Sequence, residues 1–144
     1  MTAEPGLVPL GKVTAHRISP DDTVRLAVLS GPRDGSSTTV VFEVWEPGGA
    51  QPPNSHPDSV ETFVVLAGSG RAHCDEHESD IGPGDVLVLP AGSVHRIVNT
   101  SATERLYTIT VMAPDDGFAA LIERGPVAAL DAEDLAVLRA SRAP

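Results

Sequence analysis

The chain is poor in several residue types, and each shortage excludes a class of protein. It has one cysteine, Cys74, so no disulfide can form within it and a reducing compartment is favoured. No apolar run approaches the roughly 20 residues that span a bilayer. The first residues, MTAEPGLVPLGKVTA, lack the basic start and apolar centre of a secretory signal. We therefore expect a cytoplasmic protein with no membrane partner.

Positive charge is also scarce. Lysine and arginine together number 10 against 20 acidic residues, which gives a net charge of -10. Such a surface repels phosphate backbones, and no helix-turn-helix pattern or basic patch is present, so we expect no nucleic-acid partner. The hydrophobic fraction of 41% is ordinary for a folded protein. A length of 144 residues suits a single domain that covers residues 1–144.

Glycine and proline, 13 of each, lie between short apolar runs and not in clusters. This punctuation is typical of many strands joined by turns. The turn at residues 67–70 predicts a hairpin between the strands that flank it. The predicted strands cover residues 23–29, 38–46, 61–66, 71–74, 86–89, 94–98 and 105–112.

The pattern changes near the C-terminus. Asp115 can cap a short helix that Gly125 ends, and Asp131 can begin a second helix. Strand and helix do not alternate regularly, which argues against a doubly wound fold. The sequence predicts an all-β sandwich or barrel over residues 23–112, followed by a helical tail over residues 115–140.

The side chains that could bind a metal lie in the middle of the chain. His56 lies in a loop before a predicted strand, Glu61 opens that strand, and His95 opens a later one. Imidazole and carboxylate together suit first-row divalent metals, and ligands at the mouths of neighbouring strands can converge inside a barrel. Spacing alone leaves open that these histidines are surface residues or hydrogen-bonded core residues.

The same stretch carries two spaced motifs. Gly48, Asn54, His56, Glu61 and Gly68 follow the pattern G-x5-H-x-H-x4-E-x6-G except that Asn54 replaces the first histidine. The pattern G-x5-P-x-G-x2-H-x3-N is matched at every position, by Gly84, Pro90, Gly92, His95 and Asn99. With these motifs the chain resembles the cupin family of small β-barrels.

The resemblance implies a double-stranded β-helix, or jelly roll, with short C-terminal helices. It also implies a divalent transition metal (iron, manganese, nickel, cobalt or zinc) held by His56, Glu61 and His95. Asn54 then becomes a weak ligand or a residue that orients a water or substrate beside the metal, because an amide oxygen binds such metals less well than imidazole.

Candidate substrate contacts are less well defined. Trp45 and Glu43 share one face of their strand, opposite Phe42, but apolar residues occupy both faces and alternation does not decide which points inward. His73 can point inward as a substitute ligand or base, or lie in solvent. The hydroxyl of Tyr107 can bind substrate or serve structure.

We therefore expect a metal-dependent enzyme that acts on a small organic molecule. Dioxygenase chemistry, an oxidoreductase function, comes first, followed by isomerisation, decarboxylation or cyclisation. The alternative is a non-catalytic cupin that binds a small ligand, with a structural metal or none. Strands 38–45 and 106–112 are apolar on both faces, and with the resemblance to small cupins this predicts a homodimer unless the C-terminal helices cover a sheet.

Overall fold

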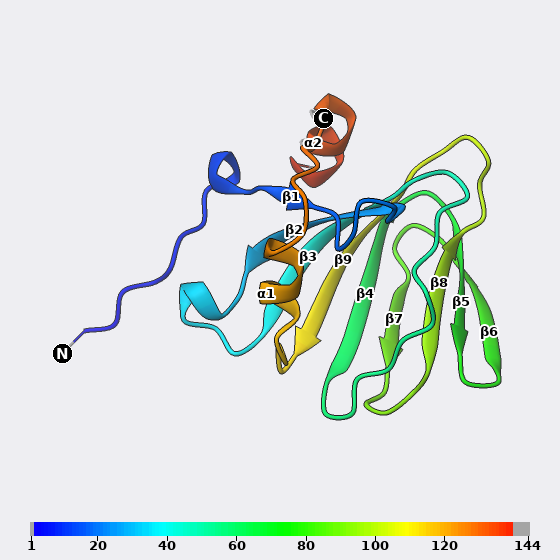
Figure 1. Cartoon of the computed structure of the whole chain (residues 1–144), viewed down its shortest axis with the longest axis horizontal. Coiled ribbons are helices and arrows are strands. Elements are labelled where there is room, and N and C mark those ends of the chain that lie inside the picture. Colours follow the sequence, from blue (N-terminus) through cyan, green and yellow to red (C-terminus); the bar gives the residue numbers. More distant parts are fainter. Residues whose placement is uncertain (1, 140–144) are drawn as a thin grey trace.

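The computed structural model describes residues 2–139 and consists mainly of antiparallel strands in two facing sheets (Figure 1). Two short helices follow the last strand. The strands are β1 (Ala15–His16), β2 (Val24–Ser30), β3 (Thr39–Trp45), β4 (Val60–Ala67), β5 (Gly70–Cys74), β6 (His77–Ile81), β7 (Val86–Leu89), β8 (His95–Asn99) and β9 (Leu106–Ala113). The helices are α1 (Phe118–Glu123) and α2 (Ala132–Arg139), and single turns of 3-10 helix cover Leu10–Lys12 and Pro32–Asp34.

The strand order confirms the predicted jelly roll and corrects one detail. The larger sheet runs β1-β2-β3-β9-β4-β7, and the smaller runs β6-β5-β8. The turn at 67–70 therefore does not make a hairpin, because β4 pairs with β7 and β9 whereas β5 pairs with β6 and β8. The chain crosses at this turn from one sheet to the other, which lets two faces enclose one core.

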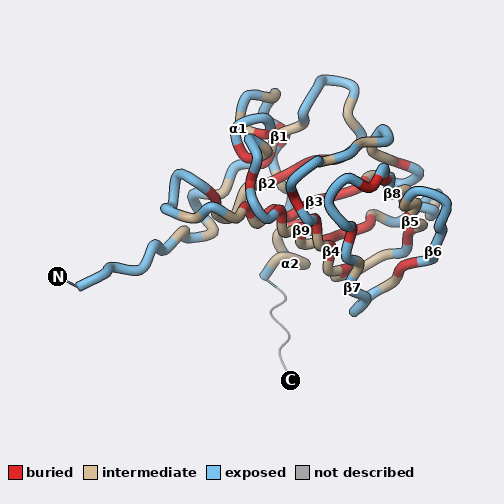
Figure 2. Tube along the Cα trace, turned by 90° about the horizontal axis from the view of Figure 1, so that it is seen from below, coloured by how far each residue is buried: buried red, intermediate tan, exposed pale blue. Residues whose placement is uncertain are grey.

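The space between the sheets holds the main hydrophobic core. Every second residue of β3 and β4 points into it, including Val41, Trp45, Phe63 and Val65, each at most 1% exposed. The inward face of β3 is therefore the one that carries Glu43 and Trp45. Figure 2 shows the buried segments concentrated in β2, β3, β9 and β4, while β6 is mostly exposed.

The opposite face of the large sheet has its own apolar cover. Phe42, Val44 and Tyr107 form a second cluster against which Val137 and Leu138 of α2 pack. This explains why β3 and β9 are apolar on both faces without any partner chain. The sequence analysis gave two possible covers for this face, a partner chain or the C-terminal helices, and the structure shows that a helix covers it.

The sequence analysis did not predict two of the strands, and the end of its predicted helical tail lies outside the described residues. β1 has two residues and β6 reads HESDI, so neither shows an apolar run. Both helices fall inside the predicted tail, of which residue 140 lies beyond the described part of the chain. Within residues 2–139, no helix is long and apolar enough to cross a membrane; the expected compartment stays a prediction.

Candidate metal centre

The loop between β3 and β4 is held along β8 like an additional short strand. The backbone N–H of Asn54 donates to the carbonyl of His95 at 3.0 Å, and the N–H of His95 donates back at 2.9 Å. Ala50 forms a similar bridge with Val98. Residues that directly oppose each other in an antiparallel pair carry their side chains on the same face. The two motifs are thus joined by backbone hydrogen bonds, with residues 54 and 95 side by side.

His56 is fixed by its backbone and by its ring. Its carbonyl accepts a 2.7 Å hydrogen bond from the N–H of Gly92, whose φ of 81° lies in the left-handed region that favours glycine. Its ring packs against Phe118 of α1, with 6.5 Å between centroids. The motif glycine before His95 therefore helps to hold the loop histidine in place.

The structure brings His56, Glu61 and His95 together. The Nε2 atom of His56 lies 3.4 Å from Oε2 of Glu61, and Nε2 of His95 lies 2.9 Å from the same oxygen. One ligand atom from each residue fits within a group whose members are all within 4.8 Å of one another. Glu61 and His95 are buried, and His56 is half-buried. The predicted ligands thus form one compact cluster.

The atoms of this cluster fit a cation. Oε2 of Glu61 and Nε2 of His95 are buried without a hydrogen bond of proper geometry, despite their short separation. Buried polar atoms are rarely left without partners, so such a group needs an explanation. Two imidazoles and one carboxylate are a donor set that first-row divalent metals accept, in catalytic zinc sites and in iron(II) oxygenases. These residues would hold such an ion with coordination positions left over.

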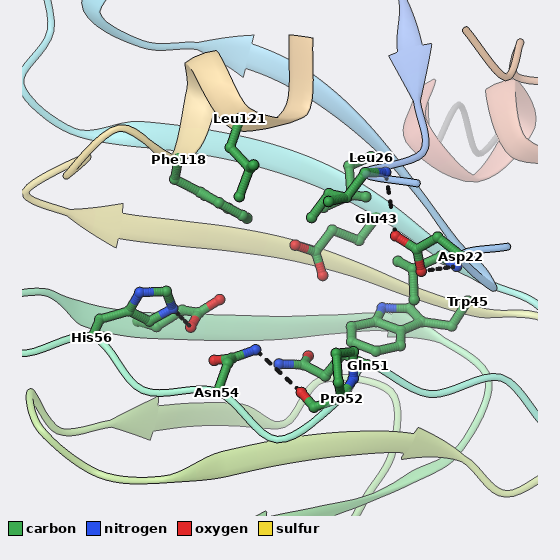
Figure 3. A pocket seen from close by; sticks show the side chains of 13 residues that line it. Asp22, Leu26, Glu43, Trp45, Gln51, Pro52, Asn54, His56, Phe118 and Leu121 are labelled. Atoms are coloured by element: carbon green, nitrogen blue, oxygen red, sulfur yellow. Dashed lines mark hydrogen bonds and ion pairs between the residues drawn. The ribbon is translucent and has the colours of Figure 1, made fainter. Parts of the chain in front are cut away.

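Asn54 adds a fourth polar atom at this place. Its Oδ1 is also buried without a partner, while its Nδ2 lies 3.5 Å from the carbonyl of Pro52. Figure 3 shows the amide oxygen on the side of the cavity that holds His56. The amide is therefore placed to present its oxygen to whatever occupies the cluster.

A cavity of about 230 Å³ adjoins the cluster between β2, β3, α1 and the loop (Figure 3). Its wall is mostly apolar, with a few carboxyl and amide groups. Among the described residues it is lined by Ile18, Asp22, Val24, Leu26, Glu43, Trp45, Gln51, Pro52, Asn54, His56, Glu61, Phe118 and Leu121. His95 does not line the cavity and is the buried third member of the cluster.

Of the three predicted substrate contacts, only one residue lines the cavity. Trp45 lines the cavity and donates from its indole N–H to the hydroxyl of Thr108 at 3.1 Å. Tyr107 lies on the opposite face of the sheet, where its hydroxyl donates to Asp134 at 3.0 Å, so of its two predicted roles the structure supports the structural one and not the substrate contact. His73 also lies outside the cavity, with Nδ1 3.2 Å from Glu78 on β6. Strand alternation explains the position of Tyr107, because the odd-numbered residues of β9 point away from the space between the sheets.

Two parts of the site were not predicted as such. The first is the lid formed by Phe118 and Leu121 of α1, which the sequence marked only as a helix. The second is Glu43, whose side chain is 3% exposed inside the cavity. Burial, with the nearby negative charge of Glu61 as a second cause, raises the pKa of Glu43 well above its ordinary value. The sequence signal that could have pointed to Glu43 is an acidic residue within an otherwise apolar strand.

Asn99, the last residue of the second motif, serves structure. Its Nδ2 lies within 3.1 Å of the carbonyls of Trp45, Glu46 and Glu104, and its Oδ1 accepts from the N–H of Ser101. A buried amide so fully bonded ties the end of β3 to the turn after β8. This residue is thus explained without a role at the cavity.

The fold and the cluster define a jelly-roll protein with a candidate metal centre between its sheets. Residues 41–112 match the family model of the cupin domain, and the chain belongs to the cupin family.

Similar proteins agree with this membership. Germin-like protein subfamily T member 3 of Arabidopsis thaliana is 39% identical over 75 residues, which are 48% of this chain and 32% of that protein. The chain spans about a third of the length of the curated relatives it matches. A predicted oxalate decarboxylase of Thermotoga maritima superposes with a TM-score of 0.65 at 25% identity, over 74% of this chain and 96% of that one. KdgF of a Halomonas species gives 0.64 at 15% identity, over 75% and 94% respectively, and shows the fold alone.

Proposed function

We propose that this cupin is a metal-dependent enzyme that acts on a small organic molecule in the cavity beside His56, Glu61 and His95. The observation that carries the proposal is the convergence of one carboxylate oxygen and two imidazole nitrogens within 4.8 Å, with buried atoms that lack other partners. When bound, a divalent transition metal supplies Lewis acidity and, if it is iron, the capacity to activate dioxygen. Oxygen insertion is the reaction class we favour.

The residues around the cluster supply the remaining requirements of such a site. Phe118 and Leu121 form an apolar side of the cavity, and Leu26 continues the apolar wall. The cavity volume of about 230 Å³ lies below the roughly 300–1,000 Å³ of typical ligand pockets, so the substrate is small. Isomerisation, cyclisation and decarboxylation use the same surroundings; the likeness to a predicted oxalate decarboxylase supports the last of these.

A non-catalytic small-ligand binder is the second candidate, and Asn54 favours it. Replacing one imidazole by an amide weakens metal affinity, as expected for a cupin that has lost catalysis and kept its cavity. Metal content separates the two candidates. Protein purified without added metal that holds only trace amounts, and gains no activity with iron(II), would favour the binder.

Elemental analysis of three proteins tests the metal centre directly. Wild type should hold close to one transition-metal ion per chain, and His95→Ala should lose it together with any turnover. His73→Ala is the matched control, because it removes a histidine outside the cavity and should keep the metal. A His95→Ala protein with wild-type metal content would contradict the proposal.

The expected homodimer is a separate proposal. The edge strand β7 leaves Val86 60% and Val88 58% exposed, and α2 already covers a different part of the large sheet. We expect light scattering with size-exclusion chromatography to give twice the chain mass. The double variant Val86→Glu, Val88→Glu should give the monomer mass, whereas Leu7→Glu, at an exposed residue of the N-terminal segment, should not. A wild-type monomer would end this proposal.

A further inference from the structure

Glu43 is a buried acidic residue of the cavity that lies apart from the metal cluster. It belongs to β3, where it pairs in register with Thr108 of β9 and Leu26 of β2. Figure 3 shows its carboxyl group pointing into the cavity, away from Trp45 and toward the end that holds His56. It is not a member of the group whose ligand atoms lie within 4.8 Å of one another. The carboxyl thus forms a second polar position in the cavity.

The described residues around Glu43 give it no cationic side chain as a partner. None of the described residues that line the cavity is lysine or arginine. No ion pair reaches Glu43 within residues 2–139. Asp22, the carboxylate at the rim, already accepts hydrogen bonds from the N–H groups of Ile18 and Val24. The hydroxyls of Thr108 and Thr110 on β9 interact with the carboxyl of Glu43 and lower its pKa, but burial raises that pKa by more.

A buried carboxyl without a cation is most stable in its neutral form. Burial and the charge of Glu61 both raise the pKa of Glu43, in agreement with this placement. A neutral carboxyl can donate one hydrogen bond and accept another, as a hydroxyl or carbonyl oxygen of a ligand requires. The rest of the wall, including Val24, Leu26 and Trp45, offers apolar contact.

The charges of the cavity also limit the ligand. Asp22, Glu43 and Glu61 are its acidic residues, and no lysine or arginine of the described wall opposes them. A carboxylate at the end near Glu43 would leave water beside acidic residues, with no lysine or arginine of the described wall to pair with it, which is costly. An uncharged oxygen at that place avoids this cost and gains a hydrogen bond.

We propose that Glu43 is a ligand-contacting residue, which hydrogen-bonds an uncharged hydroxyl or carbonyl oxygen of a small ligand whose other end reaches the His56–Glu61–His95 cluster. This inference rests on the proposed metal centre and adds to it the class of substrate. The substrate is a small, largely apolar molecule with oxygen atoms at both ends and no charge at the end near Glu43.

Three hydroxamic acids with the same zinc-binding head test this contact. Their far ends differ: butyrohydroxamic acid ends in a methyl group, β-hydroxypropionohydroxamic acid in a hydroxyl group, and malonomonohydroxamic acid in a carboxylate. The protein is loaded with zinc, its zinc content is measured, and Kd is determined by calorimetry. Emission of Trp45, the only tryptophan of the chain, gives a second reading from inside the cavity.

Wild type should bind the hydroxyl compound about tenfold more tightly than the methyl compound, as one hydrogen bond would give, and the carboxylate compound more weakly than either. In Glu43→Leu the ratio of the hydroxyl and methyl Kd values should fall to about one, because the partner is gone. Glu43→Gln keeps a donor and an acceptor and should retain part of the preference. Glu78→Gln, an exposed acid outside the cavity, should match wild type.

The outcomes separate the two proposals. Zinc bound to wild type and to Glu43→Leu, with equal hydroxyl-to-methyl ratios in both, would overturn the role of Glu43 and leave the metal centre standing. A wild-type preference for the carboxylate compound would overturn the charge class. A wild-type protein that holds no zinc would overturn the metal centre, and the contact with it.

Discussion

Arg25 of β2 and Asp134 of α2, 109 positions apart in the chain, form a buried ion pair with 2.6 Å between Nη1 and Oδ2. Asp134 is fully buried and also accepts hydrogen bonds from Arg105 at 3.1 Å and from the hydroxyl of Tyr107 at 3.0 Å. One carboxylate thus links the C-terminal helix to two strands of the large sheet. This link holds α2 over the apolar cluster around Phe42.

We expect Asp134→Ala to lower the free energy of unfolding by about 3 kcal/mol or more, because it leaves buried Arg25 without its partner. Glu133→Ala is the control. Its side chain is 61% exposed and its carboxylate forms an ion pair only with Arg105 among the described residues, so the loss should stay within about 0.5 kcal/mol. Urea denaturation measures both, and equal losses would contradict a special role for Asp134.

This relationship also shows what the sequence predicts and what it does not. Turn residues and β-branched runs located the strands of the core well, because those signals are local. The position of α2 depends on a contact between residues at opposite ends of the chain, and nothing in the pattern around Asp134 distinguishes it from a solvated acid. The apolar outward face of β3, with Phe42 and Val44, indicated only that something covers it.

Gly125, after α1, offers a test of how tightly the tail crosses the N-terminal segment. A Cβ at this position would lie 1.7 Å from the carbonyl oxygen of Arg17, which is backbone and cannot move aside alone. We expect Gly125→Ala to lower the free energy of unfolding by about 3 kcal/mol through overpacking. Gly82→Ala, where the added Cβ meets nothing within 4 Å, should change it by less than about 0.5 kcal/mol. An equally harmless Gly125→Ala would show that the crossing is loose.

Glu43 should make the stability of the metal-free protein fall as the pH rises. Its pKa in the folded state is raised above the ordinary value of 4.5 by burial and by Glu61. Between the unfolded and folded pKa values, the folded state holds a proton that the unfolded state has lost. The free energy of unfolding of wild type relative to Glu43→Gln should therefore fall by about 1.4 kcal/mol per pH unit in this window and level off above it. Urea denaturation of both proteins across the window measures the difference, and parallel pH profiles would contradict it.

The candidate site was predicted more completely than the cavity around it. Motif spacing named His56, Glu61 and His95, because those residues lie at fixed offsets from turn glycines. Which strand face lines the cavity depends on how the sheets stack, and apolar residues on both sides of β3 hid that information. The direction of Glu43 was left undecided for this reason, and the two roles of Tyr107 on β9 were left open as well.

Asn54→His should add a third imidazole, as the fourth ligand of the cluster, and tighten metal binding. Backbone hydrogen bonds at 3.0 and 2.9 Å place residue 54 directly opposite His95, so a histidine there starts from the face that carries the cluster. Imidazole is a better ligand than an amide oxygen for zinc or iron(II), and we expect the Kd for zinc to fall at least about tenfold. Competition with a metal indicator measures this, with zinc content counted in the same samples.

Asn54→Ala completes that comparison, because it removes the amide without adding a ligand. If the buried Oδ1 of Asn54 contacts the ion, Asn54→Ala should weaken zinc binding; if the amide serves the substrate instead, zinc affinity should stay at the wild-type value. An Asn54→His protein with unchanged zinc affinity would show that the ion lies out of reach of residue 54. The centre would then be a three-residue site in which Asn54 faces the substrate, so the two variants together decide which partner the amide oxygen has.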